Sequence, residues 1–153
     1  MTGTGGAAPL PEPLAELREA FLDTPERDRL QLLLEVSREL PPLPEKYAAH
    51  PEAALERVQE CQSPVYAITE VGPDGVVSFH ATAPEEAPTT RGFASILAQG
   101  LTGATAQQVL DVPDDFPLTL GLTRSVSLLR LNGMAGMLTR AKRQVREQLA
   151  ARG

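Results

Sequence analysis

The stretch VYAITEVGPDGVVSFHAT, residues 65–82, decides the fold of this chain. Two runs rich in β-branched and aromatic residues, 65–71 and 76–82, flank the segment GPDG (residues 72–75), which is typical of a hairpin turn. An isolated two-stranded ribbon is marginal in water, so we expect a third short strand over residues 57–60 beside the first run. The sequence therefore predicts a small antiparallel sheet.

Helical patterns flank this sheet on both sides. Upstream, leucines at helical spacing predict a helix over residues 14–22, and Thr24-Pro25-Glu26 predicts the start of a second helix, with the threonine as its N-cap. Downstream, residues 90–101 predict a helix with Phe93, Ile96, Leu97 and Leu101 on its inner face. Residues 105–110 predict a short helix, and residues 128–150 predict a long closing helix. Together these elements predict an α+β fold, in which helices pack on one face of a small three-stranded antiparallel sheet.

The composition indicates one domain inside the cell. Residues 1–13 carry Gly, Ala, Thr and Pro without an apolar period and predict a disordered tail, which leaves residues 14–153 as a single domain. The net charge of −6 and the pI near 4.9 argue against nucleic acid as a partner. No apolar run is long enough to span a bilayer, and no secretory signal is recognisable. We therefore expect a cytoplasmic protein without a membrane partner.

Cys61 is the only cysteine in the chain, and it lies where a loop enters the first strand of the hairpin. A single thiol cannot form an internal disulfide, and it cannot alone hold a metal ion or an iron–sulfur cluster. It can act as a nucleophile or carry a group covalently. The alternative is that Cys61 is simply a small buried apolar side chain.

Other kinds of site find less support in the sequence. A thiol hydrolase would need His50 or His80 beside Cys61, and the strand alternation predicts that His80 faces solvent. Zinc would require these three side chains and a carboxylate to converge without any close pair of ligands, so no metal site is expected. No glycine-rich phosphate loop follows a strand.

The segment CQSPVY, residues 61–66, resembles the Gly-Cys-Gln-Ser-x-Val-Trp signature of the SufE family, the sulfur acceptors that work with cysteine desulfurases in iron–sulfur cluster assembly. The similarity runs from about Pro25 to Val145, and four further segments match in order and spacing: Leu30 to Pro44, TRGF (90–93), DDF (114–116) and LRLNGM (129–134). The chain departs from the family pattern mainly at four places: Glu60 replaces glycine, Pro64 a polar residue, Tyr66 tryptophan, and Leu128-Leu129 the usual Thr-Pro-Ser.

The resemblance implies a SufE-like fold, which is shared with the scaffold proteins of cluster assembly. It implies that Cys61 accepts sulfur from a SufS-like cysteine desulfurase, carries it as a persulfide and activates that enzyme, and that a downstream iron–sulfur scaffold complex receives the sulfur. The protein itself would be an accessory protein and no enzyme. No cofactor is expected in this chain, because pyridoxal phosphate belongs to the desulfurase.

The resemblance also implies a functional arginine at Arg130, which would brace the cysteine loop or contact the partner. The alternative is a structural ion pair between Arg130 and an acid such as Asp115. Gly133 within the closing helix is expected to permit close packing under the loop. Glu60 is expected to raise the pKa of Cys61.

Several questions stay open on the sequence alone. The protein could instead be a non-catalytic regulator that binds a desulfurase-type enzyme without carrying sulfur, or a thiol hydrolase. We expect Cys61 to be shielded by apolar neighbours such as Val65, Ile68, Phe93 and Leu131. A basic stretch in the closing helix could form a docking strip or simply face solvent; it comprises Arg140, Lys142, Arg143, Arg146 and Arg152.

Overall fold

The predicted hairpin is formed by strands β2 (Tyr66–Val71) and β3 (Val77–Thr82), which pair antiparallel along their whole length. A third strand, β1 (Glu56–Arg57), pairs antiparallel with β2, so the sheet has the order β1-β2-β3. The computed structural model describes residues 9–152 of the chain. The predicted third strand is therefore present, but it is shorter than residues 57–60 and begins one residue earlier.

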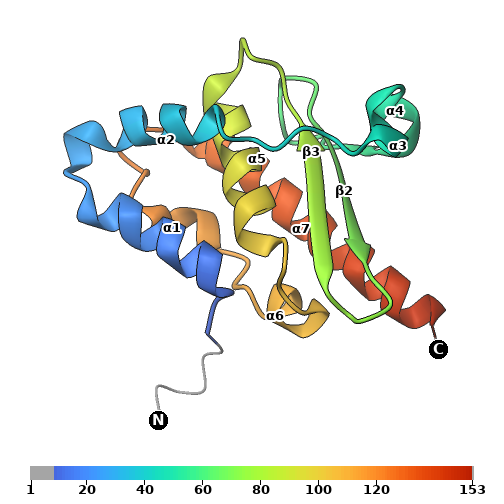
Figure 1. The fold of residues 1–153 in the computed structure, drawn as a ribbon. Helices are drawn as coiled ribbons and strands as arrows, with labels where there is room; N and C mark the ends of the chain where they lie inside the picture. The colour runs from blue at the N-terminus through green and yellow to red at the C-terminus, as the bar shows by residue number, and fades with distance from the viewer. Residues whose placement is uncertain (1–8, 153) are drawn as a thin grey trace.

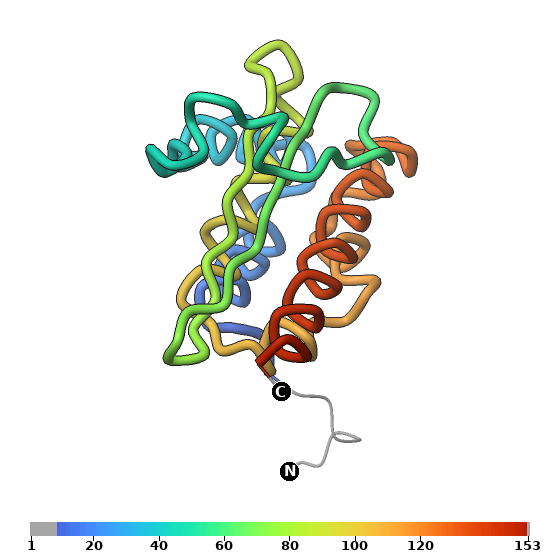
Figure 2. Tube along the Cα trace, turned by 90° about the vertical axis from the view of Figure 1, so that its right-hand side faces the viewer, coloured from blue at the N-terminus to red at the C-terminus, as the bar shows by residue number. Residues whose placement is uncertain are grey.

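Helices cover one face of this sheet, which confirms the predicted α+β class (Figure 1). On that face the buried residues are Ala67, Thr69 and Val71 of β2 and Val77, Phe79 and Ala81 of β3. Helix α5 (Pro88–Leu101) packs against β3, and the long helix α7 (Leu128–Ala151) packs against β2. Helix α7 runs beside the hairpin for most of the molecule's length (Figure 2). The alternate strand residues are only partly buried.

The N-terminal helices form a second layer on α5. Helix α1 (Glu12–Asp23) begins two residues before the expected boundary, and residues 1–8 of the expected tail lie outside the described residues. The chain then passes through a short 3₁₀ helix, η1 (Glu26–Asp28), into α2 (Arg29–Ser37). The predicted N-cap is wrong, because the Thr24 hydroxyl donates to the Ala20 carbonyl at 2.7 Å and so closes the preceding helix. Both α1 and α2 pack against α5.

The remaining elements are short. Helices α3 (Glu45–Ala48) and α4 (Pro51–Ala54) come between α2 and β1 in the chain, and α4 packs against β1 and β2. Helix α6 (Ala106–Leu110) has a complete capping box at Thr105, and the 3₁₀ helix η2 (Phe116–Leu120) precedes α7. In residues 9–152, no helix combines the length and the apolar character needed to cross a membrane.

The core between the sheet and the helices is largely aliphatic. The inward residues predicted for α5, namely Phe93, Ile96, Leu97 and Leu101, are all fully buried. Three phenylalanines are among the largest fully buried side chains, and leucine and isoleucine supply most of the others. Cys61 belongs to this core and is nearly buried, with 7% of its surface exposed.

Candidate functional site

Cys61 lies in the loop that joins β1 to β2, which we call the cysteine loop (residues 58–65). The Val58 amide donates to the Val65 carbonyl at 2.9 Å and extends the pairing of the two strands by one step. The Cys61 amide then donates to the Val58 carbonyl at 3.2 Å, which makes a tight turn just before the thiol. These two bonds shape a loop that lies on the N-terminal half of α7.

Two glycines of α7 allow the cysteine loop to lie directly on the helix. A Cβ atom on Gly133 would stand 2.9 Å from the Cys61 Sγ, closer than a real Cβ is found. A Cβ atom on Gly136 would stand 2.6 Å from the Cδ and Oε1 atoms of Glu60. The prediction that Gly133 permits close packing under the loop is thus confirmed.

A pocket of about 200 Å³ opens beside the thiol. Three separate segments line it: the cysteine loop at Glu60–Ser63, the turn into α5 at Glu86–Thr90, and the start of α7. The third segment contributes Ser127, which caps α7, and Leu129, Arg130 and Gly133 of the helix itself. Only the tertiary fold brings these segments together, and Cys61 is the one cysteine of the chain.

The environment of Cys61 makes its thiol a weak acid. Burial, followed by the neighbouring Glu60 carboxylate, raises the pKa of the Cys61 thiol to about 11, while Arg140 and Arg57 oppose this rise. The prediction that Glu60 raises the pKa is confirmed. In the resting protein at neutral pH the thiol is therefore protonated and a poor nucleophile.

Arg130 lies at the pocket and is exposed to solvent. Its backbone amide donates to the Ser127 hydroxyl at 3.3 Å, which caps the start of α7. Among residues 9–152 its guanidinium has no ion pair, so the alternative of a structural pair with Asp115 is wrong. The structure leaves this side chain available to a ligand or partner at the pocket.

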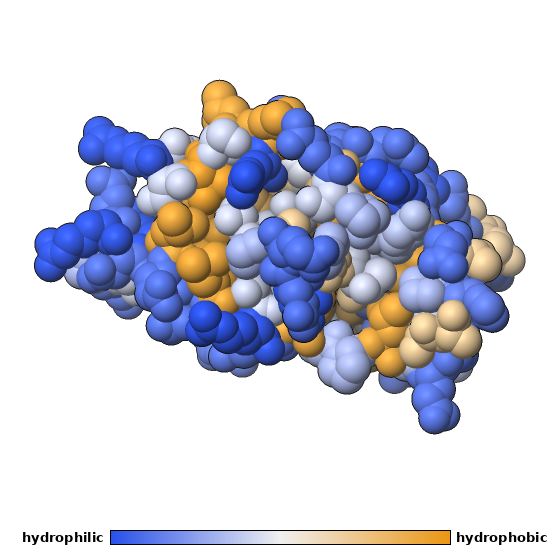
Figure 3. Space-filling view, turned by 90° about the horizontal axis from the view of Figure 1, so that it is seen from above, coloured by the Kyte–Doolittle hydropathy of each residue, from blue (hydrophilic) through white to orange (hydrophobic). Residues whose placement is uncertain are grey.

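Exposed leucines lie at the same pocket and beside it. Leu128 and Leu129 are 64% and 54% exposed, and Leu30 of α2 is 39% exposed. A neighbouring hollow contains Leu30 and shares Thr89, Ser127 and Arg130 with the pocket. Figure 3 looks onto this end of the molecule and shows hydrophobic surface in patches that are separated by polar side chains.

Three of the four residues expected to shield Cys61 are buried in the core to which it belongs. Val65, Phe93 and Leu131 belong to the same buried core as Cys61. Ile68 does not, because it alternates with the buried residues Ala67 and Thr69 and so lies on the outer face of the sheet.

Neither histidine lines the pocket. His80 lies on the outer face of the sheet, where its Nε2 is 3.3 Å from the Glu70 Oε1 and its ring contacts Tyr47. His50 is an exposed residue before α4. Within the described part of the chain, no group of three His, Cys, Asp or Glu side chains could hold a metal ion. The geometry thus offers no imidazole base for a hydrolase at Cys61.

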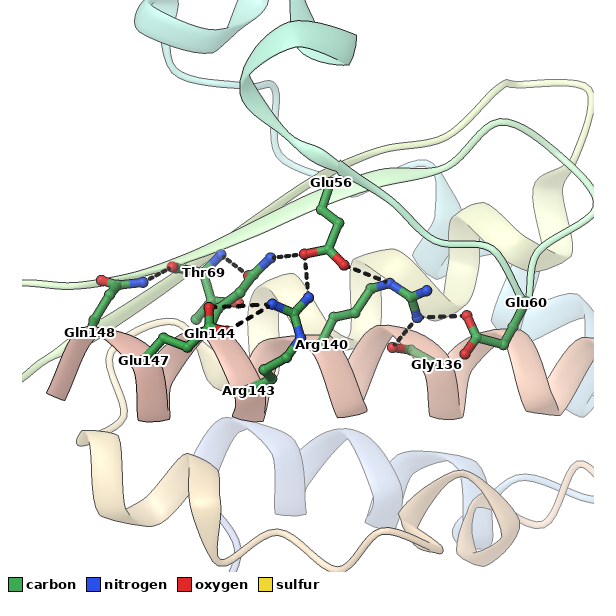
Figure 4. Close-up of polar contacts among 9 residues, drawn as sticks. All are labelled: Glu56, Glu60, Thr69, Gly136, Arg140, Arg143, Gln144, Glu147 and Gln148. Carbon is green, nitrogen blue, oxygen red and sulfur yellow. Dashed lines mark hydrogen bonds and ion pairs between the residues drawn. The ribbon is translucent and has the colours of Figure 1, made fainter. Parts of the chain in front are cut away.

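The basic stretch of α7 is largely engaged within the protein (Figure 4). Arg140 pairs with Glu56 and Glu60, and Arg143 pairs with Glu56 and Glu147. The other contacts join Lys142 to Asp114 and Arg152 to the Val71 carbonyl. These four residues therefore form neither a free docking strip nor a row that simply faces solvent. Arg140, Arg143 and Arg152 hold the sheet and the cysteine loop against α7, and Lys142 holds Asp114.

Comparison with known proteins places these features in a family. The sequence model described as "SufE: Fe-S metabolism associated domain" matches residues 15–145. An uncharacterized SufE-like protein of Mycobacterium tuberculosis is 50% identical over 140 residues, which cover 92% of this chain and 96% of that protein. A SufE-like protein of Synechocystis is 33% identical over 127 residues, covering 82% of this chain and 76% of the relative.

A solved structure shows the same architecture. The solution structure of a hypothetical protein from Thermus thermophilus superposes with a TM-score of 0.79 at 37% sequence identity. The match covers 93% of this chain and 99% of the other.

Proposed function

The chain belongs to the SufE family, which is associated with iron–sulfur metabolism, and we propose that it accepts sulfur from a cysteine desulfurase, activates that enzyme and carries the sulfur on Cys61. The observation that carries this proposal is the placement of the chain's one thiol. Cys61 lies at a pocket formed by three segments, beside Arg130, whose guanidinium has no ion pair among residues 9–152. Its loop is held by a short turn and by contacts with α7.

The proposed transfer is a thiol–persulfide exchange. The desulfurase holds sulfur as a persulfide on its own cysteine. The Cys61 thiolate attacks the outer sulfur atom, a new S–S bond forms on Cys61, and the S–S bond of the donor breaks. The donor cysteine leaves as a thiolate and takes up the proton that Cys61 lost. No external oxidant or reductant is required, because one S–S bond replaces another.

The exchange requires the cysteine loop to change its environment. A thiol with a pKa of about 11 has little thiolate at neutral pH, and the surface of α7 covers its sulfur. Docking must therefore expose Cys61 or supply positive charge to it. Either change lowers the thiol pKa and gives the partner control over when the carrier reacts.

The rim of the pocket suits a protein partner. Leu128, Leu129 and Leu30 offer apolar contacts, and the Arg130 guanidinium offers a fork for a carboxylate of the desulfurase. In this proposal Arg130 is a contact residue, and pyridoxal phosphate stays in the desulfurase, which breaks the carbon–sulfur bond. The protein is then an accessory carrier that delivers sulfur to an iron–sulfur scaffold complex.

The test measures the transfer of sulfur to Cys61 and the stimulation of desulfurase turnover. After incubation with a desulfurase and cysteine, the intact mass of the protein should rise by one sulfur atom, located on Cys61. Cys61→Ser should lose both this mass gain and the acceleration of desulfurase turnover, because serine is a far weaker nucleophile at neutral pH. Ser63→Ala, a change in the same loop and pocket, is the matched control and should retain both.

The same experiment separates the carrier from a regulator. If Cys61→Ser stimulates turnover as well as the wild type does, the thiol is dispensable and the protein is a non-catalytic regulator of the enzyme.

A further inference from the structure

Glu60, the residue before Cys61, is held in place by α7. Its carboxylate lies over Gly136, and its Oε1 accepts a hydrogen bond from the Arg140 Nη1 at 2.6 Å. The same Nη1 donates to the Gly136 carbonyl at 3.2 Å (Figure 4). The Glu60 side chain is thus fixed to the helix by a charge-assisted bond next to the reactive cysteine.

Arg140 is itself anchored on the side away from the cysteine loop. Its side chain is only 14% exposed, and its Nε lies 3.2 Å from the Glu56 Oε2 of β1 in an ion-pair contact without hydrogen-bond alignment. Glu56 is held in turn by Arg143 and by Gln144, whose amide donates at 3.1 Å. Because Arg140 is anchored at β1, its bond to Glu60 ties the cysteine loop to a rigid part of the fold.

We propose that Glu60 and Arg140 form a latch that holds the cysteine loop on α7 and thereby positions Cys61 in its shielded state. This inference rests on the proposed function and adds to it the contact that controls when Cys61 becomes exposed. To free the thiol, the loop must break the Glu60–Arg140 bond and lift the Glu60 carboxylate off Gly136. A partner that offers its own carboxylate to Arg140, or a cation to Glu60, offsets this cost and opens the loop.

The latch and a purely electrostatic effect of the same two residues predict opposite changes in the reaction rate of Cys61. The charged groups that face Cys61 are Glu60, Arg57 and Arg140, with Arg130 and Glu86 across the pocket. If only charge mattered, removing the Arg140 cation would disfavour the thiolate and slow the reaction of Cys61. The latch requires the opposite, because removing Arg140 releases the loop and exposes the thiol.

The test is the rate at which iodoacetamide alkylates Cys61 in the isolated, full-length protein, measured across a range of pH. Arg140→Gln should react about fivefold faster than the wild type at neutral pH, with its apparent pKa moved down. Glu60→Asp keeps the charge but shortens the side chain, so it should also react faster by a similar factor. A slower or unchanged rate in Arg140→Gln overturns the latch.

Arg143→Gln is the matched control, since it removes a cation bound to Glu56 but leaves the Glu60–Arg140 bond in place. It should lose some stability and keep the wild-type alkylation rate. If it accelerates alkylation as much as Arg140→Gln does, general loosening explains the result and the latch is rejected. The Glu60 side chain is partly exposed, so Glu60→Asp should fold and provides a second measurement if Arg140→Gln does not fold.

No desulfurase takes part in these measurements. Failure of the latch therefore shows in the alkylation rates, whereas failure of the proposed function shows in the absence of a sulfur mass gain on Cys61.

Discussion

Gly133→Ala is the substitution that most directly tests the contact between the cysteine loop and α7. The added methyl group would stand 2.9 Å from the Cys61 Sγ and 3.9 Å from both the Cys61 Cα and the Glu60 carbonyl oxygen. The nearest of these atoms belongs to a short side chain on a loop, whereas the methyl group belongs to a long helix. We therefore expect the loop to move and the helix to stay, so that the thiol is displaced from its shielded position.

Two opposing terms set the expected effect on stability. Alanine is favoured over glycine inside a helix by about 1 kcal/mol. Overpacking of a tight contact costs about 1–3 kcal/mol. The net loss of unfolding free energy is then about 1 kcal/mol, which lowers Tm by about 2–4 °C in a chain of this length.

The effect on thiol reactivity is larger. Burial and the Glu60 charge raise the pKa of Cys61 from 9.0 to about 11. At neutral pH, loss of this whole shift would raise the thiolate fraction about a hundredfold, and loss of half of it about tenfold. We expect Gly133→Ala to speed alkylation of Cys61 by about tenfold.

The assay follows alkylation of the isolated protein by mass spectrometry, together with thermal unfolding. Gly100→Ala is the matched control, because its added Cβ would stand 2.4 Å from the Leu14 Cδ1 in the contact between α1 and α5, away from the thiol. It should destabilise the fold without faster alkylation in the native state. If Gly133→Ala raises Tm and leaves the alkylation rate at the wild-type value, the loop does not press on the helix as described.

Three further outcomes are expected. Because the pKa of Cys61 is higher in the folded state than in the unfolded state, its contribution to stability is complete below pH 9.0 and is lost as the pH rises towards about 11. In urea titrations across that pH window, the unfolding free energy of the wild type should fall by about 1–2 kcal/mol more than that of Cys61→Ala. This is less than the full pKa shift implies, because the pocket opens to solvent. Parallel curves for the two proteins would show that the thiol pKa is not perturbed. Arg91 donates to the Ser37 and Ala83 carbonyls, so Arg91→Ala should cost about 2 kcal/mol in denaturant unfolding, whereas Arg38→Ala, at an exposed residue, should cost little; equal losses would contradict this role. Finally, a desulfurase whose own cysteine has been replaced should accelerate alkylation of Cys61 on docking, and rapid labelling of the free protein that the partner only slows would reject the gated loop.

Short-range patterns made the fold predictable. Strand alternation on either side of GPDG gave the hairpin and the outward position of His80, and apolar spacing gave α5 and its four inward residues. The motif around Cys61 and the glycine at position 133 pointed to the site before any geometry was known. Thr24 was misassigned because its hydroxyl was free to bond backwards to the Ala20 carbonyl, a choice that local sequence does not decide.

Contacts between distant segments were not predictable in the same way. The basic residues of α7 looked like a solvated strip, since nothing in a helical pattern shows which of its charges will meet an acid. Ile68 was expected beside Cys61 by its predicted face, but the structure buries Ala67 and Thr69 on either side of it and so places Ile68 on the outer face of the sheet.

The sequence by itself determined the class of fold, the presence of a single thiol and the segments that line the pocket, because turn chemistry, apolar periodicity and residue type act over a few neighbouring residues. Only the tertiary structure decided that Cys61 rests protonated on Gly133, and that Arg140 binds the carboxylate of Glu60 across 80 positions of the chain. Burial and ion pairing depend on which side chains share a small volume, and that is settled only when α7 packs against the sheet.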